Sequence, residues 1–215
     1  MKVYLDAGHG GVDSGAIGID GRQEKDDAQR LTDLVANKLK GSGITVVVNT
    51  DVNQTLQSVV NQSNSENVDL FISIHRNAFD DPKSNGLEVY TCQNPREVTN
   101  ANANIVYERL LRVAQMTSRG VKEANFYVLK YTNAPAMLLE IGFVTNKNDN
   151  ALFDQNIEGY ANAIADGINK IFGLSNISKT KYQIILGDFA SKDEAIKVMQ
   201  IIKNVGIIGE IKEIS

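Results

Sequence analysis

The only two histidines of this 215-residue chain, His9 and His75, both follow apolar runs that are typical of buried strands. His9 lies in the glycine-rich segment LDAGHGG, and His75 ends the run LFISIH. Two carboxylates occupy comparable places, because Glu24 follows a long glycine-rich segment and Glu140 ends the run AMLLE. Two imidazoles and a carboxylate suit a catalytic zinc ion (Zn²⁺), whose fourth position is left to water. These residue types therefore predict an open zinc site, provided that the fold brings them together.

Each of these residues also has a simpler interpretation. A lone histidine after a strand is more often hydrogen-bonded than bound to a metal, and Glu24 would stabilise the dipole of a helix that it begins. Asn77, just beyond the second histidine, suits a turn. Glu140 has the weakest simple interpretation, because an unpaired charge inside the apolar run PAMLLEIGF would be costly to bury. The zinc hypothesis thus depends on where the surrounding elements place these side chains.

Strands and helices alternate along most of the chain. We expect strands at 2–6, 44–50, 68–75, 86–92, 125–129 and 136–143, and helices at 24–40, 55–67, 98–117 and 156–172. Strands separated by helices of this length form right-handed crossovers, which predicts an α/β fold with a mostly parallel twisted sheet flanked by helices. Because chemistry in such sheets gathers beyond the carboxyl ends of the strands, the candidate residues are expected along one edge.

Composition narrows the classes of partner. The net charge of −4 at pH 7 argues against a general attraction to nucleic acid or to anionic membranes. No stretch approaches the roughly 18 apolar residues of a membrane span, and the first residues lack the apolar region of a secretory signal. The single cysteine, Cys92, excludes an intramolecular disulfide. We therefore expect a globular chain that is made in the cytoplasm and that binds neither nucleic acid nor a membrane.

Four segments together resemble the zinc-dependent N-acetylmuramoyl-L-alanine amidases of the type 3 family. They are YLDAGHGGVDSGAIGIDGRQEK, DLFISIHRNA, SRGVKEANFYVL and PAMLLEIGFVTN, and the resemblance extends in order over residues 2–172. It implies that His9, Glu24 and His75 are the zinc ligands and that Glu140 is the catalytic glutamate. It also implies the substrate, since this family cleaves the amide between N-acetylmuramic acid and L-alanine in peptidoglycan.

The resemblance further implies a reaction in which Glu140 takes a proton from zinc-activated water and passes it to the departing alanine nitrogen. Arg76 and Asn77 are predicted to bind substrate. Arg76 stands where a small residue is expected, so it would narrow the groove or contact a peptide carboxylate. Two other functions stay open: a zinc peptidase that acts on the stem peptide, and a non-catalytic wall-binding module, against which the intact ligand set counts.

The C-terminal residues are predicted to form a separate small module. We expect a catalytic domain at 1–173, a polar linker at 174–180 and a strand–helix–strand module at 181–215, with Ser191 capping the helix. The module resembles one half of a sporulation-related repeat domain, a glycan-binding fold. It is shorter than the ~40 residues below which a domain usually needs association or another staple. We therefore predict that two tails pair into a homodimer; the alternative is that the tail folds back on the catalytic domain.

Enzymes of this kind without an export signal resemble phage endolysins and the amidases that lyse a sporulating mother cell. We therefore expect a bacteriolytic endolysin or autolysin that acts on the cell wall after membrane permeabilisation or lysis.

Overall fold

A computed structural model describes residues 1–49, 55–174 and 189–204. It divides the chain into two compact units, Met1–Ile177 and Ser178–Ser215, and this division falls within the predicted linker. The second unit contributes helix α6, Lys192–Asn204. The strands predicted on either side of α6 lie outside the described residues. Among the described helices, none has the length and apolar character needed to cross a membrane.

The first unit is built on a six-stranded sheet with the order β2-β1-β3-β6-β4-β5. The strands are β1 Lys2–Ala7, β2 Thr45–Val48, β3 Leu70–Asn77, β4 Leu87–Thr91, β5 Ser118–Glu123 and β6 Ala136–Phe143. Neighbouring strands are parallel except for β4 and β6, which are antiparallel. The predicted α/β fold with a mostly parallel sheet is confirmed, and the carboxyl ends of β1, β3 and β6 share one edge.

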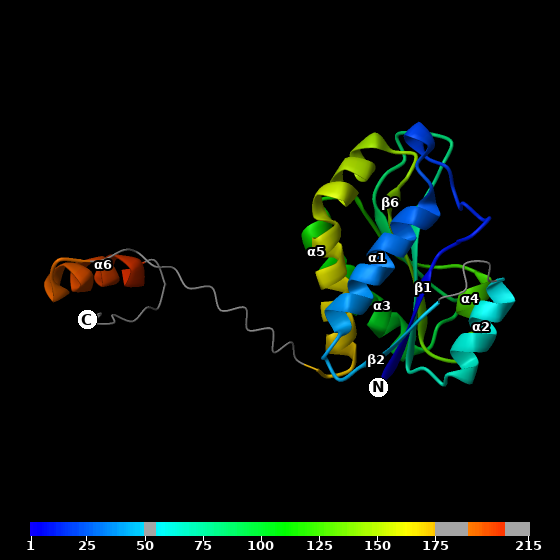
Figure 1. Cartoon of the computed structure of the whole chain (residues 1–215), viewed down its shortest axis with the longest axis horizontal. Coiled ribbons are helices and arrows are strands. Elements are labelled where there is room, and N and C mark those ends of the chain that lie inside the picture. The colour runs from blue at the N-terminus through cyan, green and yellow to red at the C-terminus, as the bar shows by residue number, and fades with distance from the viewer. Residues whose placement is uncertain (50–54, 175–188, 205–215) are drawn as a thin grey trace. The chain divides into compact units, whose positions relative to one another are not determined.

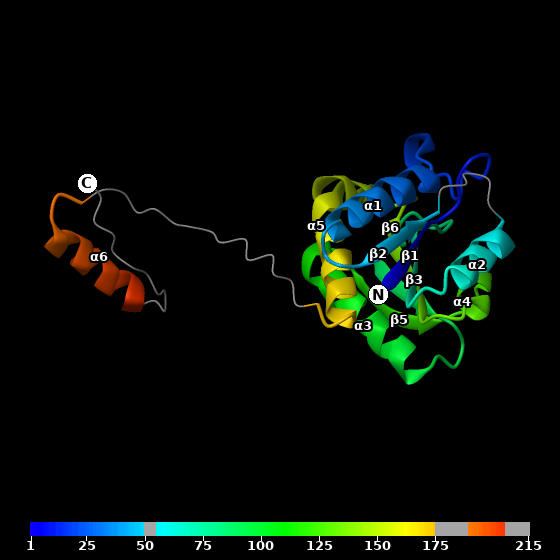
Figure 2. The same cartoon turned by 60° about the horizontal axis from the view of Figure 1, so that its bottom comes forward.

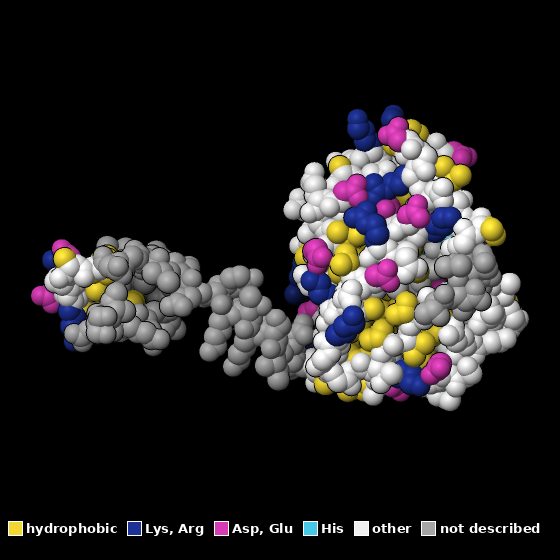
Figure 3. Space-filling view, viewed as in Figure 1, with side chains coloured by type: hydrophobic (Ala, Val, Ile, Leu, Met, Phe, Trp, Pro, Cys, Tyr) yellow, Lys and Arg dark blue, Asp and Glu magenta, His cyan; other side chains and the backbone are white. Residues whose placement is uncertain are grey.

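Helices cover both faces of this sheet (Figure 1; Figure 2). One face carries α1 Glu24–Leu39, α3 Glu97–Ala114 and α5 Lys147–Ile171, and the other carries α2 Leu56–Ser65 and α4 Tyr127–Tyr131. A short 3₁₀ turn, η1 Ile19–Gly21, precedes α1. The larger core lies under α1, α3 and α5, and a smaller core lies under α2 and α4. The outer face that carries α1 mixes acidic and basic side chains (Figure 3), in keeping with the small net charge.

One predicted strand is wrong, and one strand of the sheet was not predicted. The strand expected at 125–129 is instead the short helix α4. A helical turn lets the adjacent residues Val128 and Leu129 both pack into the smaller core, whereas a strand would point them to opposite faces. The edge strand beside β4 is β5, which the sequence analysis did not predict. Its residues are exposed or half-buried and lack a buried apolar alternation. Pairing with β4, rather than a pattern of its own, therefore makes this segment a strand.

Capping side chains mark the starts of two helices. Helix α5 begins at Lys147 rather than at the predicted residue 156, because the Asn146 side chain accepts a hydrogen bond from the Asp149 amide at 3.0 Å. Asn156 instead marks a kink within this helix, with a φ of −131°. In the second unit, the Glu194 amide donates to Ser191 Oγ at 3.3 Å, which confirms the predicted cap of α6.

Candidate active site and metal centre

Three strands change from apolar to polar on the same face of the sheet, at the edge of the smaller core. The apolar residues are Tyr4, Phe71 and Leu138, and the polar residues two positions later are Asp6, Ser73 and Glu140. Strand pairing holds these changes in line, since Asp6 is the partner of Ser73, and His75 that of Glu140. A cleft therefore opens beyond the core formed with α2 and α4, and it is lined by polar side chains from β1, β3 and β6.

His9, Glu24 and His75 converge in this cleft as a group that could hold a metal ion. One ligand atom from each lies within 4.8 Å of the others. His75 Nδ1 is 2.8 Å from Glu24 Oε1, and His9 Nε2 is 3.2 Å from Glu24 Oε2. The structure thus brings together the three predicted ligands, although they come from a loop, the first turn of α1 and the end of β3.

Two glycines make room for the imidazole rings. A Cβ atom at Gly8 would lie 2.3 Å from Cε1 of His75, and a Cβ at Gly15 would lie 2.6 Å from Cδ2 of His9. Gly15 also has a φ of +62°, which a residue with a side chain rarely adopts. The backbone at both places would have to move if a side chain were added. Two nitrogen donors and one carboxylate, packed this closely, are a donor set that fits a divalent cation.

The charges of the group favour a cation between its members. Burial opposes ionisation of Glu24, yet hydrogen bonds from His75 and His9 hold its pKa well below the usual range. The hydrogen bond to Glu24 raises the pKa of His9 to about 9. Burial alone would lower the pKa of His75, but Glu24 and the nearby Glu140 outweigh it and raise the pKa. The same negative field that holds protons on the imidazoles would attract a metal ion.

The carboxyl group of Glu140 lies beside the three candidate ligands. It is the cross-strand partner of His75, and among the described residues its Oε2 is buried without a hydrogen-bond partner. Burial, reinforced by the charge of Glu24, raises the pKa of Glu140 to about 8. A carboxyl group with a free oxygen and a pKa near neutrality can accept a proton and return it. Glu140 is thus placed for proton transfer in the cleft.

Arg76 and Asn77 lie on opposite faces of β3. Asn77 lines the cleft, where its Nδ2 donates a hydrogen bond to Glu88 at 2.5 Å, so a substrate contact remains a prediction. The Arg76 side chain is only 1% exposed and pairs with Asp27 of α1 at 2.5 Å. Only its backbone N–H reaches the site, donating to Glu24. The structure therefore does not support the predicted substrate contact of Arg76, because strand alternation turns the guanidinium into the layer of α1 and α5.

The sequence interpretation missed one buried carboxylate next to the site. Glu88 is 1% exposed and is the antiparallel partner of Glu140. Arg119 Nε donates to Glu88 at 2.8 Å, and Lys122 forms a second ion pair with it. The signal that drew attention to Glu140 was also present here, since Glu88 is a charge inside the apolar run GLEVYTC.

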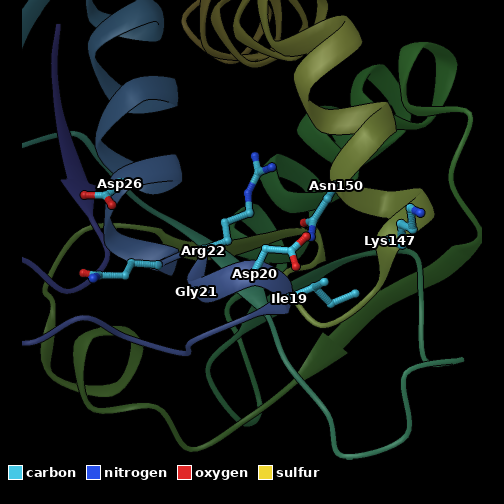
Figure 4. A pocket seen from close by; sticks show the side chains of 8 residues that line it. Ile19, Asp20, Gly21, Arg22, Asp26, Lys147 and Asn150 are labelled. Carbon is cyan, nitrogen blue, oxygen red and sulfur yellow. The ribbon is translucent and has the colours of Figure 1, made fainter.

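A second cleft lies near the start of α1, and none of the predicted ligands lines it (Figure 4). It lies around Ile19, Asp20, Lys147 and Asn150, with the Arg22 side chain at its wall. Arg22 is already paired, because its guanidinium donates to Asp27 and to Asp154 at 2.6 and 2.8 Å. The charges of this cleft therefore stabilise the packing of α1 against α5.

Comparison with known proteins gives one consistent result. Residues 3–170 match the Amidase_3 family model, described as N-acetylmuramoyl-L-alanine amidase. The N-acetylmuramoyl-L-alanine amidase CwlM of Bacillus licheniformis is 33% identical over 201 residues, which cover 91% of this chain and 78% of that protein. The endolysin of Bacillus phage SPP1 is 32% identical over 191 residues, covering 82% of this chain and 68% of the endolysin.

A solved structure shows the same similarity in three dimensions. The catalytic domain of CwlV, an N-acetylmuramoyl-L-alanine amidase from Bacillus (Paenibacillus) polymyxa var. colistinus, superposes with a TM-score of 0.75 at 33% identity. The match covers 81% of this chain and 99% of that domain.

Proposed function

The chain belongs to the Amidase_3 family of N-acetylmuramoyl-L-alanine amidases, and on this premise we propose that His9, Glu24 and His75 hold a catalytic zinc ion. Family membership makes the chain a hydrolase of the amide between N-acetylmuramic acid and L-alanine in peptidoglycan. The observation that supports a metal centre is the convergence of the three ligand atoms within 4.8 Å of one another. When bound there, zinc supplies Lewis-acid chemistry, since it polarises a carbonyl and makes water more acidic.

The residues of the chain account for the proton transfers. Hydrolysis adds a hydroxyl group to the amide carbon and a proton to the alanine nitrogen. Glu140 accepts the proton of the attacking water and then donates it to the departing nitrogen, so no covalent intermediate with the protein is needed. Glu140 Oε2 supports this role, because it has no hydrogen-bond partner in the described part of the chain and is free to receive the proton. Backbone amides of Ala16 and Arg76 donate to Glu24 and hold this ligand in place.

Replacement of the proton-transfer group tests the proposal. Glu140→Gln is expected to lower turnover roughly 100- to 10,000-fold, because general acid–base catalysis contributes that much. Zinc content and thermal stability are expected to stay near those of the wild type, since no ligand is removed. Glu158→Gln, on the exposed side of α5, is the matched control and should keep full activity. Substantial turnover by Glu140→Gln would refute the role of Glu140.

The same digestion separates the amidase from a stem-peptide peptidase. Purified peptidoglycan treated with the enzyme is expected to show new L-alanine amino termini. New termini within the stem would indicate a peptidase, and intact peptidoglycan would indicate a binding module. The family and the named relatives support the first outcome.

We further propose that the C-terminal module makes the enzyme a homodimer that binds the wall through two tails. The apolar side chains of α6 support this, since Ile196 is 38% exposed and a second copy of the module would cover it. A dimer would raise avidity for an insoluble polymer without new contacts. Light scattering is expected to give twice the monomer mass for the full chain and the monomer mass for a version ending at Gly173. A monomeric full chain, or a dimeric truncation, would refute the proposal.

We also propose that the enzyme is made in the cytoplasm and reaches peptidoglycan after membrane permeabilisation or lysis, as an endolysin or autolysin. Similarity to the SPP1 endolysin supports such a lytic role. Protein added from outside is expected to lower the turbidity of suspensions of isolated Gram-positive walls. Inertness on every such preparation would count against the lytic role, while leaving the amidase chemistry to be tested on soluble fragments.

A further inference from the structure

The outer nitrogen of each ligand histidine meets an oxygen atom, but in two different ways. His9 Nδ1 lies 2.9 Å from Asp13 Oδ2, a carboxylate whose side chain is 65% exposed. His75 Nε2 lies 3.1 Å from Ser73 Oγ, and Ser73 Oγ in turn donates to Asp6 Oδ2 at 2.6 Å. The first contact is direct and solvated. The second passes through a hydroxyl group and ends on a buried carboxylate.

We propose that Ser73 and Asp6 are positioning residues of the metal site, which hold the His75 ring with Nδ1 toward the metal and Nε2–H toward Ser73. The inference rests on the zinc centre proposed above. It assigns no role in the chemical step to either residue, since both act through His75.

The direction of this hydrogen-bond chain follows from the donors and acceptors. Ser73 Oγ donates to Asp6 Oδ2, so the single hydroxyl proton of Ser73 is used in that bond. The Ser73 oxygen can then only accept from His75, which requires a proton on Nε2. A neutral imidazole carries one proton, so Nδ1 keeps its lone pair for the metal. Outer partners of this kind fix the tautomer and the orientation of ligand histidines.

Sheet register and close packing hold the chain in place. Asp6 and Ser73 are paired residues on β1 and β3, and they are 5% and 0% exposed. The His75 ring packs on the backbone of Gly8, where an added Cβ would lie 2.3–2.5 Å from three ring atoms. A flip of this ring about its Cβ–Cγ bond would turn carbon atoms toward both Glu24 and Ser73. Only the observed orientation satisfies both contacts.

The competing explanation is that Ser73 and Asp6 only satisfy one another within the sheet. In that case their replacement would lower the stability of the metal-free protein and leave its affinity for zinc unchanged. A positioning role instead lowers zinc affinity in a protein that is still folded. Zinc affinity and metal-free stability must therefore be measured on the same variants.

Ser73→Ala and Asp6→Asn in the full chain are the variants that test the role. We expect each to weaken zinc binding roughly 10- to 100-fold in competition with a chelator, as loss of an outer partner does at other metal sites. Ser63→Ala is the matched control, because Ser63 is also 0% exposed but lies on α2 outside the cleft. Its zinc affinity should equal that of the wild type. An affinity within twofold of the wild type for folded Ser73→Ala would overturn the proposal.

Nitrogen NMR of the wild-type protein gives a test that does not depend on any variant folding. The chain has only two histidines, so its zinc-loaded imidazole spectrum contains four ring nitrogens that can be assigned. We expect zinc on Nδ1 and a proton on Nε2 of His75, and a faster exchange of that proton in Asp6→Asn. Zinc on Nε2 of His75 would refute the positioning role alone. No change at either histidine on addition of zinc would refute the zinc centre itself.

Discussion

Loss of the negative charge of Asp27 is expected to destabilise the catalytic unit strongly. Its carboxylate accepts from Arg76 Nη1 at 2.5 Å and from Arg22 Nε at 2.6 Å. The Arg76 side chain is 1% exposed, and its guanidinium lies 4.1 Å over the Phe153 ring. Burial removes water from this guanidinium and lowers the pKa of Arg76 to about 10. Among the described residues, Asp27 is the carboxylate that pairs with it.

The structure gives the size of the effect. Breaking a buried ion pair so that one charge is left alone costs about 3–5 kcal/mol. Asp27→Asn keeps an oxygen that can accept from Arg76, so the lower end, about 3 kcal/mol, is expected. For a unit of this size that loss lowers Tm by roughly 6–12 °C. Arg76→Met should cost less than Asp27→Asn, because Asp27 keeps two hydrogen bonds from Arg22.

Urea unfolding of the full chain, followed by far-UV circular dichroism, measures both variants. The chain has no tryptophan, so tyrosine fluorescence serves as the second probe. Arg76→Met is also expected to keep the wild-type KM for peptidoglycan, because its guanidinium does not reach the cleft. The reasoning is refuted if Asp27→Asn unfolds within 1 kcal/mol of the wild type, or if Arg76→Met is the more damaging change.

Three further predictions concern the site and its surroundings. Gly8→Ala is expected to abolish tight zinc binding, because its Cβ would lie 2.3 Å from the His75 ring. Gly21→Ala is the control: a φ of +76° makes it cost stability, but its Cβ meets nothing within 4 Å, so it should bind zinc normally in the same chelator competition. Burial alone would raise the pKa of Glu88, but the two basic side chains of β5 hold it below the usual value of 4.5, so the native carboxylate stabilises the fold above that pH and loses this effect as pH falls. The stability gap between wild type and Glu88→Gln in urea should therefore be wide at pH 7 and narrow at pH 3, and a constant gap would contradict the ion pairs. Finally, zinc added at 100 times its Kd should raise the free energy of unfolding of the metal-free protein by about 2.7 kcal/mol. An unchanged Tm would count against a metal centre.

Local patterns in the sequence were sufficient for most of the fold. The alternation of apolar runs with helical spacing predicted the parallel sheet and its flanking helices, because burial imposes those periods on the chain. His9, His75 and Glu140 follow the apolar runs LDAG, LFISI and AMLL. This placed them at the carboxyl ends of parallel strands, where active sites of such sheets lie. A cap such as Ser191 was also readable, since it depends only on residues within one turn.

Segments without a burial pattern of their own were not predictable in this way. β5 is a polar edge strand that exists because β4 pairs with it, and α4 is a helical turn made from strand-forming residues because Val128 and Leu129 reach the core. In both cases tertiary contacts outweigh local propensity, which amounts to less than about 1 kcal/mol per residue.

The surroundings of the ligands were decided by tertiary structure alone. The alternation of side chains along a strand indicates that Arg76 points to the opposite face from His75 and Asn77. Only the fold shows that Asp27 lies on that face. The contact of Asp6 with Ser73 depends on the register between β1 and β3, and that of Glu88 with Glu140 depends on an antiparallel pairing in a mostly parallel sheet. The sequence by itself determined which groups could bind a metal, because residue type sets donor chemistry. Their partners come from distant segments, so only the packed sheet determined how those groups are held.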